Sequence, residues 1–132
     1  MDFAGRMAGR ALPGWIIGFT GELGCGKTVF AKGFAKGLGI DERVNSPTFT
    51  ILHSYESGRM PFHHFDVYRI EEPEEMEEIG YEDCFFSDGV TLVEWAELIK
   101  DIMPEETIWI KVTKNPEKGY DYRLFEISGY EE

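Results

Sequence analysis

The sequence has 132 residues, of which 42% are hydrophobic and 29% charged, values that are ordinary for a globular domain with a substantial core. No apolar run approaches the length of a membrane span and no basic-then-apolar leader opens the chain, so we expect a cytoplasmic protein that makes no membrane contact. The two cysteines, Cys25 and Cys84, are too few for a disulfide framework or for a cysteine metal site.

The net charge of −12 is unevenly distributed along the chain. Eleven Asp or Glu residues and no Lys or Arg lie between Arg69 and Lys100, which leaves the remainder close to neutral. A broad nucleic-acid surface would need clustered basic residues, so extensive contact with a phosphate backbone is excluded. A solvated acidic face is the preferred interpretation, and docking of a basic partner is the alternative.

The first part of the chain predicts a helix, a strand and a second helix. Residues 2–12 favour a short helix that stops at Pro13-Gly14, and the apolar run WIIGFT at 15–20 is typical of a buried strand. From Lys27 to Leu38 the apolar residues recur every four positions on one helical face, and Gly39 provides a stop signal.

The rest of the chain is mostly predicted strand. In order, we expect a strand at 48–56, a strand at 60–70 after the turn 57–59, a short acidic helix at 73–80, a buried strand at 90–95, and paired strands at 107–114 and 120–128. This order predicts a single α/β domain over residues 1–132, with few helices and a mixed parallel and antiparallel sheet.

A glycine-rich motif separates the first predicted strand from the second predicted helix. It fits G-x-x-x-x-G-K-[ST] at every fixed position, with Gly21, Glu22, Leu23, Gly24, Cys25, Gly26, Lys27 and Thr28. Such a loop turns successive backbone N–H groups toward a phosphate, and the following helix adds the positive end of its dipole. Lys27 can reach the β- and γ-phosphates, and the Thr28 hydroxyl can bind Mg²⁺. The motif predicts a P-loop NTPase-like domain.

The nucleotide is predicted to be ATP. A GTPase would be expected to carry D-x-x-G and N-K-x-D after the loop. The only D-x-x-G, at residues 2–5, lies before the loop, and N-K-x-D does not occur.

Two acidic residues at predicted strand ends are candidates for the chemistry. Asp66 follows apolar and aromatic residues and is predicted to hold the Mg²⁺ through its waters. Glu94 ends the run VTLV and is predicted to activate the attacking water or to sense the γ-phosphate. Lys27, Asp66 and Glu94 are thus the expected catalytic residues, and Thr28, Asp66 and Glu94 the expected metal-binding ones.

Four motifs in this order resemble the TsaE (YjeE) family of small P-loop ATPases. They are GELGCGKT at 21–28, SPTFT at 46–50, HFDVYRI at 64–70 and LVEW at 92–95. The resemblance runs from about Trp15 to Trp95. The sequence departs from the family at Glu22, where Asp is common, and at Cys25, where Ala is usual.

The resemblance implies a role beside TsaB-like and TsaD-like subunits in placing threonylcarbamoyl on adenosine of tRNA, with tRNA contacted only indirectly by this chain. It also implies that SPTFT is a switch-like loop in which Thr48 approaches the phosphate or metal. Glu94 and Trp95 would flank the nucleotide, with Glu94 acting in hydrolysis. ATP and Mg²⁺ are the implied cofactors.

Two other functions remain open from the sequence. A small nucleotide or metabolite kinase would be expected to carry an arginine-rich lid, yet Arg123 is the only arginine after Arg69. A nucleotide-dependent binding module without meaningful turnover is the third alternative. His63 and His64 are adjacent in a predicted strand and point to opposite faces, so they do not predict a zinc site.

Overall fold

The computed structural model describes residues 2–21, 27–41, 52–68, 70–72, 74–114, 117 and 123–129. Of residues 2–3, 21, 27–29, 112–114 and 123–125 it describes the backbone alone. The strands are β1 (Ile16–Gly21), β2 (Leu52–Tyr55), β3 (Phe62–Asp66), β4 (Val90–Glu94), β5 (Ile108–Lys114) and β6 (Arg123–Ser128). The helices are α1 (Asp2–Gly9), α2 (Lys27–Gly37), α3 (Glu75–Glu78), α4 (Tyr81–Phe85) and the 3₁₀ helix η1 (Ala96–Ile102).

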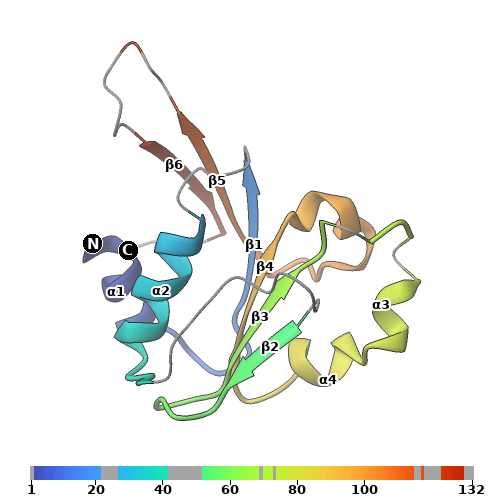
Figure 1. The fold of residues 1–132 in the computed structure, drawn as a ribbon, viewed down its shortest axis with the longest axis horizontal. Coiled ribbons are helices and arrows are strands. Elements are labelled where there is room, and N and C mark those ends of the chain that lie inside the picture. Colours follow the sequence, from blue (N-terminus) through green and yellow to red (C-terminus); the bar gives the residue numbers. More distant parts are fainter. Residues whose placement is uncertain are drawn as a thin grey trace.

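The six strands form one sheet in the order β2-β3-β4-β1-β5-β6 (Figure 1). The four inner strands β3, β4, β1 and β5 pair in parallel, whereas β2 and β6 pair antiparallel at the two edges. The predicted mixed sheet is therefore confirmed, and the hairpins predicted on either side of the acidic segment are its two antiparallel edges.

Each face of the sheet is covered by a different group of helices. α1 and α2 pack over one face, where Ile17, Phe19 and Leu92 belong to their core cluster. The helices α3, α4 and η1 pack against the other face, which presents Ile16 and Val93 to them. Figure 1 shows the sheet between α1 and α2 on one side and α3 and α4 on the other. The inner strands read as apolar runs because both faces are buried.

Aromatic rings attach α2 to the sheet. The ring of Phe30 meets Phe19 of β1 edge-on at 5.1 Å between centroids, and Phe34 stacks on Phe62 of β3 at 5.7 Å. Phe30 and Phe34 also stack on one another at 6.0 Å. Aromatic pairs of this kind add to the apolar area that they bury. α2 is thus fixed to both the first strand and the strand that ends in Asp66.

The structure differs from the sequence-based expectations mainly in element length. The first helix ends at Gly9 and not at residue 12, and the strand expected at 60–70 is β3, which ends at Asp66. The helices α4 and η1 were not predicted. Helices this short show no sustained 3.6-residue periodicity, and η1 is kinked at Ile99, where φ is −123° and ψ is 30°.

The packing of α1 against α2 depends on a close approach at Gly37. A Cβ atom placed there would lie 2.7 Å from the Ala8 Cβ, 2.8 Å from the Gly5 carbonyl oxygen and 3.0 Å from the Gly5 Cα. Two of these three atoms belong to backbone, which cannot move aside as a flexible side chain can. The helices could therefore not keep this separation with any larger residue at position 37.

We expect Gly37→Ala to lower the free energy of unfolding by about 1–3 kcal/mol, the usual cost of overpacking. The matched control is Gly9→Ala, since a Cβ at Gly9 meets nothing within 4 Å. That control should be neutral or stabilising by up to about 1 kcal/mol, because alanine favours helix more than glycine does. Urea denaturation of both variants checks this, and equal effects would contradict the close-approach argument.

The hairpin of β2 and β3 holds a half-buried histidine. Ser54 Oγ and His63 Nδ1 lie 2.8 Å apart across the two strands. Burial lowers the pKa of His63 from its usual 6.5, and the nearby Glu56 carboxylate only partly opposes this effect. The unfolded chain therefore binds a proton at His63 more readily than the folded chain does.

Because of this difference, His63 should make stability fall as the pH drops below about 6.5, and should have no effect well above that pH. We expect the wild-type protein to lose more free energy of unfolding than His63→Asn between about pH 7.5 and pH 5.5. Urea denaturation of both proteins across this range measures the difference. Parallel pH profiles would show that His63 titrates alike in the folded and unfolded chains.

Candidate nucleotide site

The parallel pairing of three strands brings the predicted functional residues to one edge of the sheet. Glu94, the last residue of β4, lies opposite Phe19 of β1 on one side and Asp66 of β3 on the other. β1 continues two residues past Phe19, to Gly21, where the glycine-rich motif begins. Adjacent strands are about 4.8 Å apart, so Glu94 lies one strand from the start of the motif and Asp66 lies two. Asp66 is 45 residues and Glu94 is 73 residues from Gly21 in the sequence, yet all three lie at the ends of neighbouring strands.

The strand and helix that flank the glycine-rich motif lie where the sequence predicts them. β1 ends at Gly21, and α2 begins at Lys27 with Thr28 as its second residue. The predicted binding residues between them, Glu22, Leu23, Gly24, Cys25 and Gly26, lie outside the described residues, as does Thr48. The strand–motif–helix order needed for a phosphate loop is therefore present in the chain.

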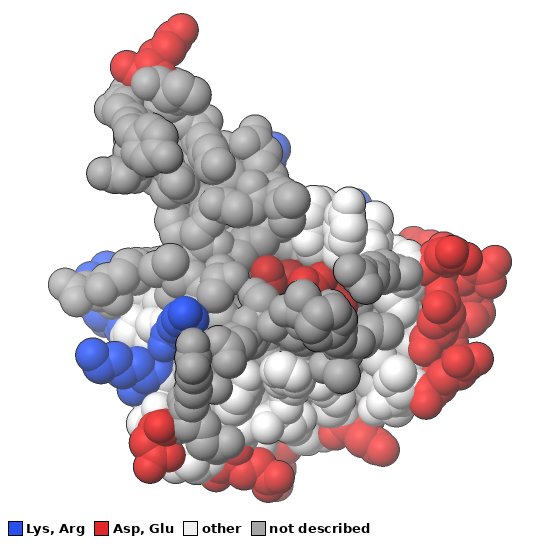
Figure 2. Space-filling model, in the orientation of Figure 1, with Lys and Arg blue, Asp and Glu red and all other residues white. Residues whose placement is uncertain are grey.

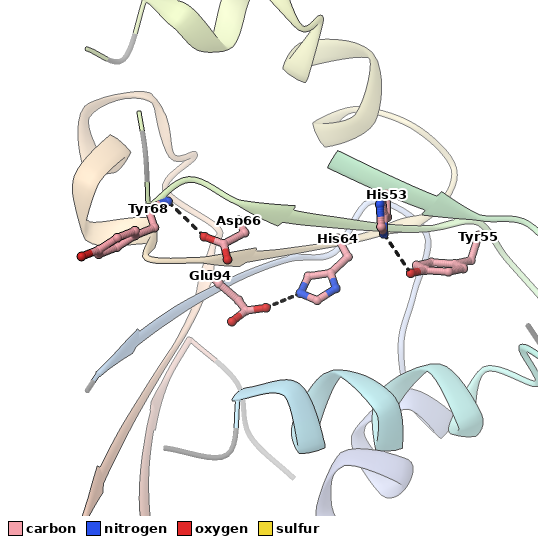
Figure 3. Close-up of polar contacts among 6 residues, drawn as sticks. All are labelled: His53, Tyr55, His64, Asp66, Tyr68 and Glu94. Atoms are coloured by element: carbon pink, nitrogen blue, oxygen red, sulfur yellow. Dashed lines mark hydrogen bonds and ion pairs between the residues drawn. The ribbon is translucent and has the colours of Figure 1, made fainter. Parts of the chain in front are cut away.

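Glu94 is buried and paired with a histidine of the neighbouring strand. The residue is 4% exposed, and its Oε2 lies 2.5 Å from Nε2 of His64, which is fully buried (Figure 3). Burial of a carboxylate is costly unless it is hydrogen-bonded or paired. This contact was not predicted from the sequence, in which His64 is weighed only as a zinc ligand. The alternation HFD, with His64 and Asp66 on one face of a strand, was the available signal.

Asp66 is half-buried at the end of β3 and is fixed by a local turn. Its Oδ1 accepts a hydrogen bond from the backbone N–H of Tyr68 at 3.0 Å. Figure 3 shows Asp66 and Glu94 on neighbouring strands, with Glu94 directed toward His64. The structure therefore places both predicted acids at the same edge, in different surroundings.

The chain turns sharply directly after Glu94. Trp95 has φ 63° and ψ 34°, a left-handed conformation that costs a non-glycine residue about 1–2 kcal/mol. Its ring packs at 4.8 Å from that of Tyr68, which follows Asp66 by two residues. The backbone N–H of Val67 donates to the Glu94 carbonyl oxygen at 3.3 Å. These contacts tie the ends of β3 and β4 together beside the two acids.

Charged side chains are unevenly distributed over the face drawn in Figure 2. Figure 2 shows carboxylates gathered along the side where Figure 1 draws α3, and basic groups on the side of α1 and α2.

Among the described residues, no cluster of three or more His, Cys, Asp or Glu residues is arranged to hold a metal ion. Of the helices described, none has the length and apolar character needed to cross a membrane.

Comparisons with known proteins agree on one family. The model of the family described as threonylcarbamoyl adenosine biosynthesis protein TsaE matches residues 1–123. The chain is 49% identical over 107 residues to the tRNA threonylcarbamoyladenosine biosynthesis protein TsaE of Bacillus subtilis, covering 81% of this chain and 66% of that relative, just under two thirds. It is 42% identical over 109 residues to the protein of the same name from Treponema pallidum, covering 82% and 80% of the two chains.

The fold agrees with this similarity. The crystal structure of Bacillus subtilis YdiB matches this structure with a TM-score of 0.78 at 40% sequence identity, covering 94% of this chain and 74% of that one. The similarity extends over the α/β fold of a P-loop NTPase-like protein. Matches in both sequence and structure cover most of the chain, and the protein therefore belongs to the TsaE family.

Proposed function

We propose that this protein is a Mg²⁺-dependent ATPase. It would act as the nucleotide-switch subunit of the cytoplasmic machinery that places threonylcarbamoyl on adenosine of tRNA. The observation that carries the proposal is the shared edge of the sheet. There β1 leads into G-x-x-x-x-G-K-T, and the two strands beside it, β4 and β3, end in the buried Glu94 and in Asp66. Family membership supports the pathway, and the edge supports the chemistry.

The described frame suits a nucleotide phosphate group. α2 has eleven residues, and its Phe30 packs on Phe19, the residue of β1 opposite Glu94, so the positive end of the helix lies toward this edge. Protein sites hold Mg²⁺ through one or two carboxylates, with phosphate oxygens and water as the other ligands, so no dedicated cage of side chains is needed. Bound Mg·ATP would supply the γ-phosphate and a cation that shields its charge.

Each residue then has a defined role. Lys27 would neutralise the β- and γ-phosphates, and Thr28 would offer its hydroxyl to the cation. Asp66, two strands from β1, would hold a water of the cation, and Glu94, one strand away, would orient and deprotonate the attacking water. Thr48 and Trp95 would contact the nucleotide from the two loops that respond to it.

Partner proteins would complete the activity. We propose TsaB-like and TsaD-like subunits, with tRNA bound by them and only indirectly by this chain, in keeping with its net charge of −12. ATP would order the segments around 46–50 and 94–95, and hydrolysis would release them.

Loss of the Lys27 ammonium should weaken ATP binding by about tenfold to 150-fold, the effect of losing one charge-assisted hydrogen bond of about 1.5–3 kcal/mol. Isothermal titration of Lys27→Ala with Mg·ATP measures this. Lys32→Ala is the matched control, since Lys32 is an exposed lysine of the same helix. Equal binding by the two variants would refute the phosphate-loop assignment.

Hydrolysis of Mg·ATP should be slow for the purified protein and should rise when the TsaB and TsaD proteins of the same organism are added. Glu94→Gln should lower kcat by about 10²–10⁴-fold with or without partners, because the amide cannot act as a base. Its affinity for ATP should stay close to that of the wild type. The Gln side chain keeps the size of Glu and can still accept a hydrogen bond from His64.

Other results of the same assay would support the alternatives. Transfer of the γ-phosphate to a small acceptor would indicate a kinase. Tight ATP binding without turnover under any condition, and normal behaviour of Glu94→Gln, would indicate a nucleotide-dependent binding module. Hydrolysis that ignores both partners would leave the ATPase but remove the switch-subunit role.

A further inference from the structure

His64 is a buried polar side chain with one hydrogen bond among the described residues. Its side chain is 0% exposed, and Nε2 lies 2.5 Å from Glu94 Oε2, whose side chain is 6% exposed. The second ring nitrogen, Nδ1, is buried without a hydrogen-bond partner among the described residues. If the side chain only filled space in the core, an apolar residue would do so without the free-energy cost of burying polar nitrogens. The contact with Glu94 is therefore the feature of His64 that needs an explanation.

The strand register places His64 behind the Glu94 carboxylate. His64 lies opposite Leu92, and Glu94 lies opposite Asp66, so the two side chains are diagonal neighbours on the face covered by α2. Figure 3 shows the two side chains directed toward one another on this face. The hydrogen bond thus reaches Glu94 from the interior of the sheet. Oε2 takes this contact, and none of the described residues forms a hydrogen bond with Oε1.

The His64 ring is itself held in place. It stacks on Phe62 with 6.0 Å between centroids and 21° between planes, and Phe62 stacks on Phe34 of α2. An ionised carboxylate only accepts hydrogen bonds, so the partner of such a carboxylate is the tautomer that donates Nε2–H. The order Phe34–Phe62–His64–Glu94 connects the packing of the phosphate-loop helix to the orientation of the carboxylate.

We propose that His64 is a positioning residue, which fixes one oxygen of Glu94 by donating Nε2–H so that the other oxygen acts on water. This inference rests on the hydrolytic role proposed for Glu94. His64 does not touch the nucleotide, so its loss changes the rate of the chemical step and leaves nucleotide affinity unchanged. Loss of such a supporting hydrogen bond typically lowers activity by about 10–100-fold.

Two amide substitutions separate positioning from packing. In His64→Gln the amide nitrogen lies three bonds from Cβ, as Nε2 of histidine does, and it can still donate to Glu94. In His64→Asn the amide nitrogen lies two bonds from Cβ, at the place of Nδ1, and it cannot reach Glu94. We expect His64→Asn to lower kcat by about 10–100-fold with unchanged KM for Mg·ATP, and His64→Gln to recover kcat to within about threefold of wild type.

Two further proteins complete the test. His63→Asn, an adjacent histidine on the opposite face of β3, should keep wild-type kcat. In a Glu94→Gln background, His64→Asn should lower kcat no further, because the group it positions is already gone. A further loss of kcat in that background, or equal losses in His64→Asn and His64→Gln, would overturn the proposal.

A spectroscopic measurement tests the contact without any turnover. In protein labelled with ¹⁵N-histidine, Nε2 of His64 should carry the proton and Nδ1 should not, and Glu94→Gln should shift the Nε2–H resonance. A proton on Nδ1 alone, or an Nε2–H resonance that does not shift in Glu94→Gln, would overturn the inference. This holds even if His64→Asn does not fold. If the spectrum is as expected but the wild-type protein does not hydrolyse ATP with its partners, the result would instead count against the proposed ATPase.

Discussion

The parallel pairing of β4 between β1 and β3 is the constraint on which the candidate site depends. Each of these strands ends at the same edge of the sheet, so their last residues meet there. A one-residue slip of β4 would move Glu94 to the face covered by α3, α4 and η1. It would also move Val93 to the face covered by α1 and α2. That slip is costly because it would take the buried Glu94 carboxylate away from His64 and into an apolar cluster. The pairing with His64 and the packing of the core therefore fix the position of the acid together.

The same core links the two sides of the site. α2 carries Lys27 and Thr28 at its start and the rings of Phe30 and Phe34 further along. Those rings pack on Phe19 and on Phe62, which lie in strands on either side of β4. The orientation of the helix that follows the glycine-rich motif and the spacing of the two acids are thus set by one set of contacts. A substitution in this core would shift the residues of the site, because close-packed interiors transmit strain.

The acidic residues of this protein lie in two different environments. The carboxylates of the α3 and α4 region are mostly exposed, as in Glu77, Glu78 and Glu82, and water solvates them at little cost. Glu94 is buried, and it persists there next to His64. Buried carboxylates with a specific partner at a strand edge are frequent in functional sites, whereas exposed ones mainly affect solubility. Burial, not the number of acids, distinguishes Glu94 from its neighbours in the sequence.

The sequence alone determined most strands, the two longer helices, the glycine-rich motif and the family, because periodicity, turn residues and motif spacing are properties of short segments. It also indicated Asp66 and Glu94, since each follows an apolar run. The order of the strands, the left-handed turn at Trp95 and the pairing of His64 with Glu94 were decided only by the tertiary structure. His64 and Glu94 are 30 residues apart, and they meet because β3 and β4 pair in one register. Such a register depends on the packing of the whole sheet, which no single segment of the sequence contains.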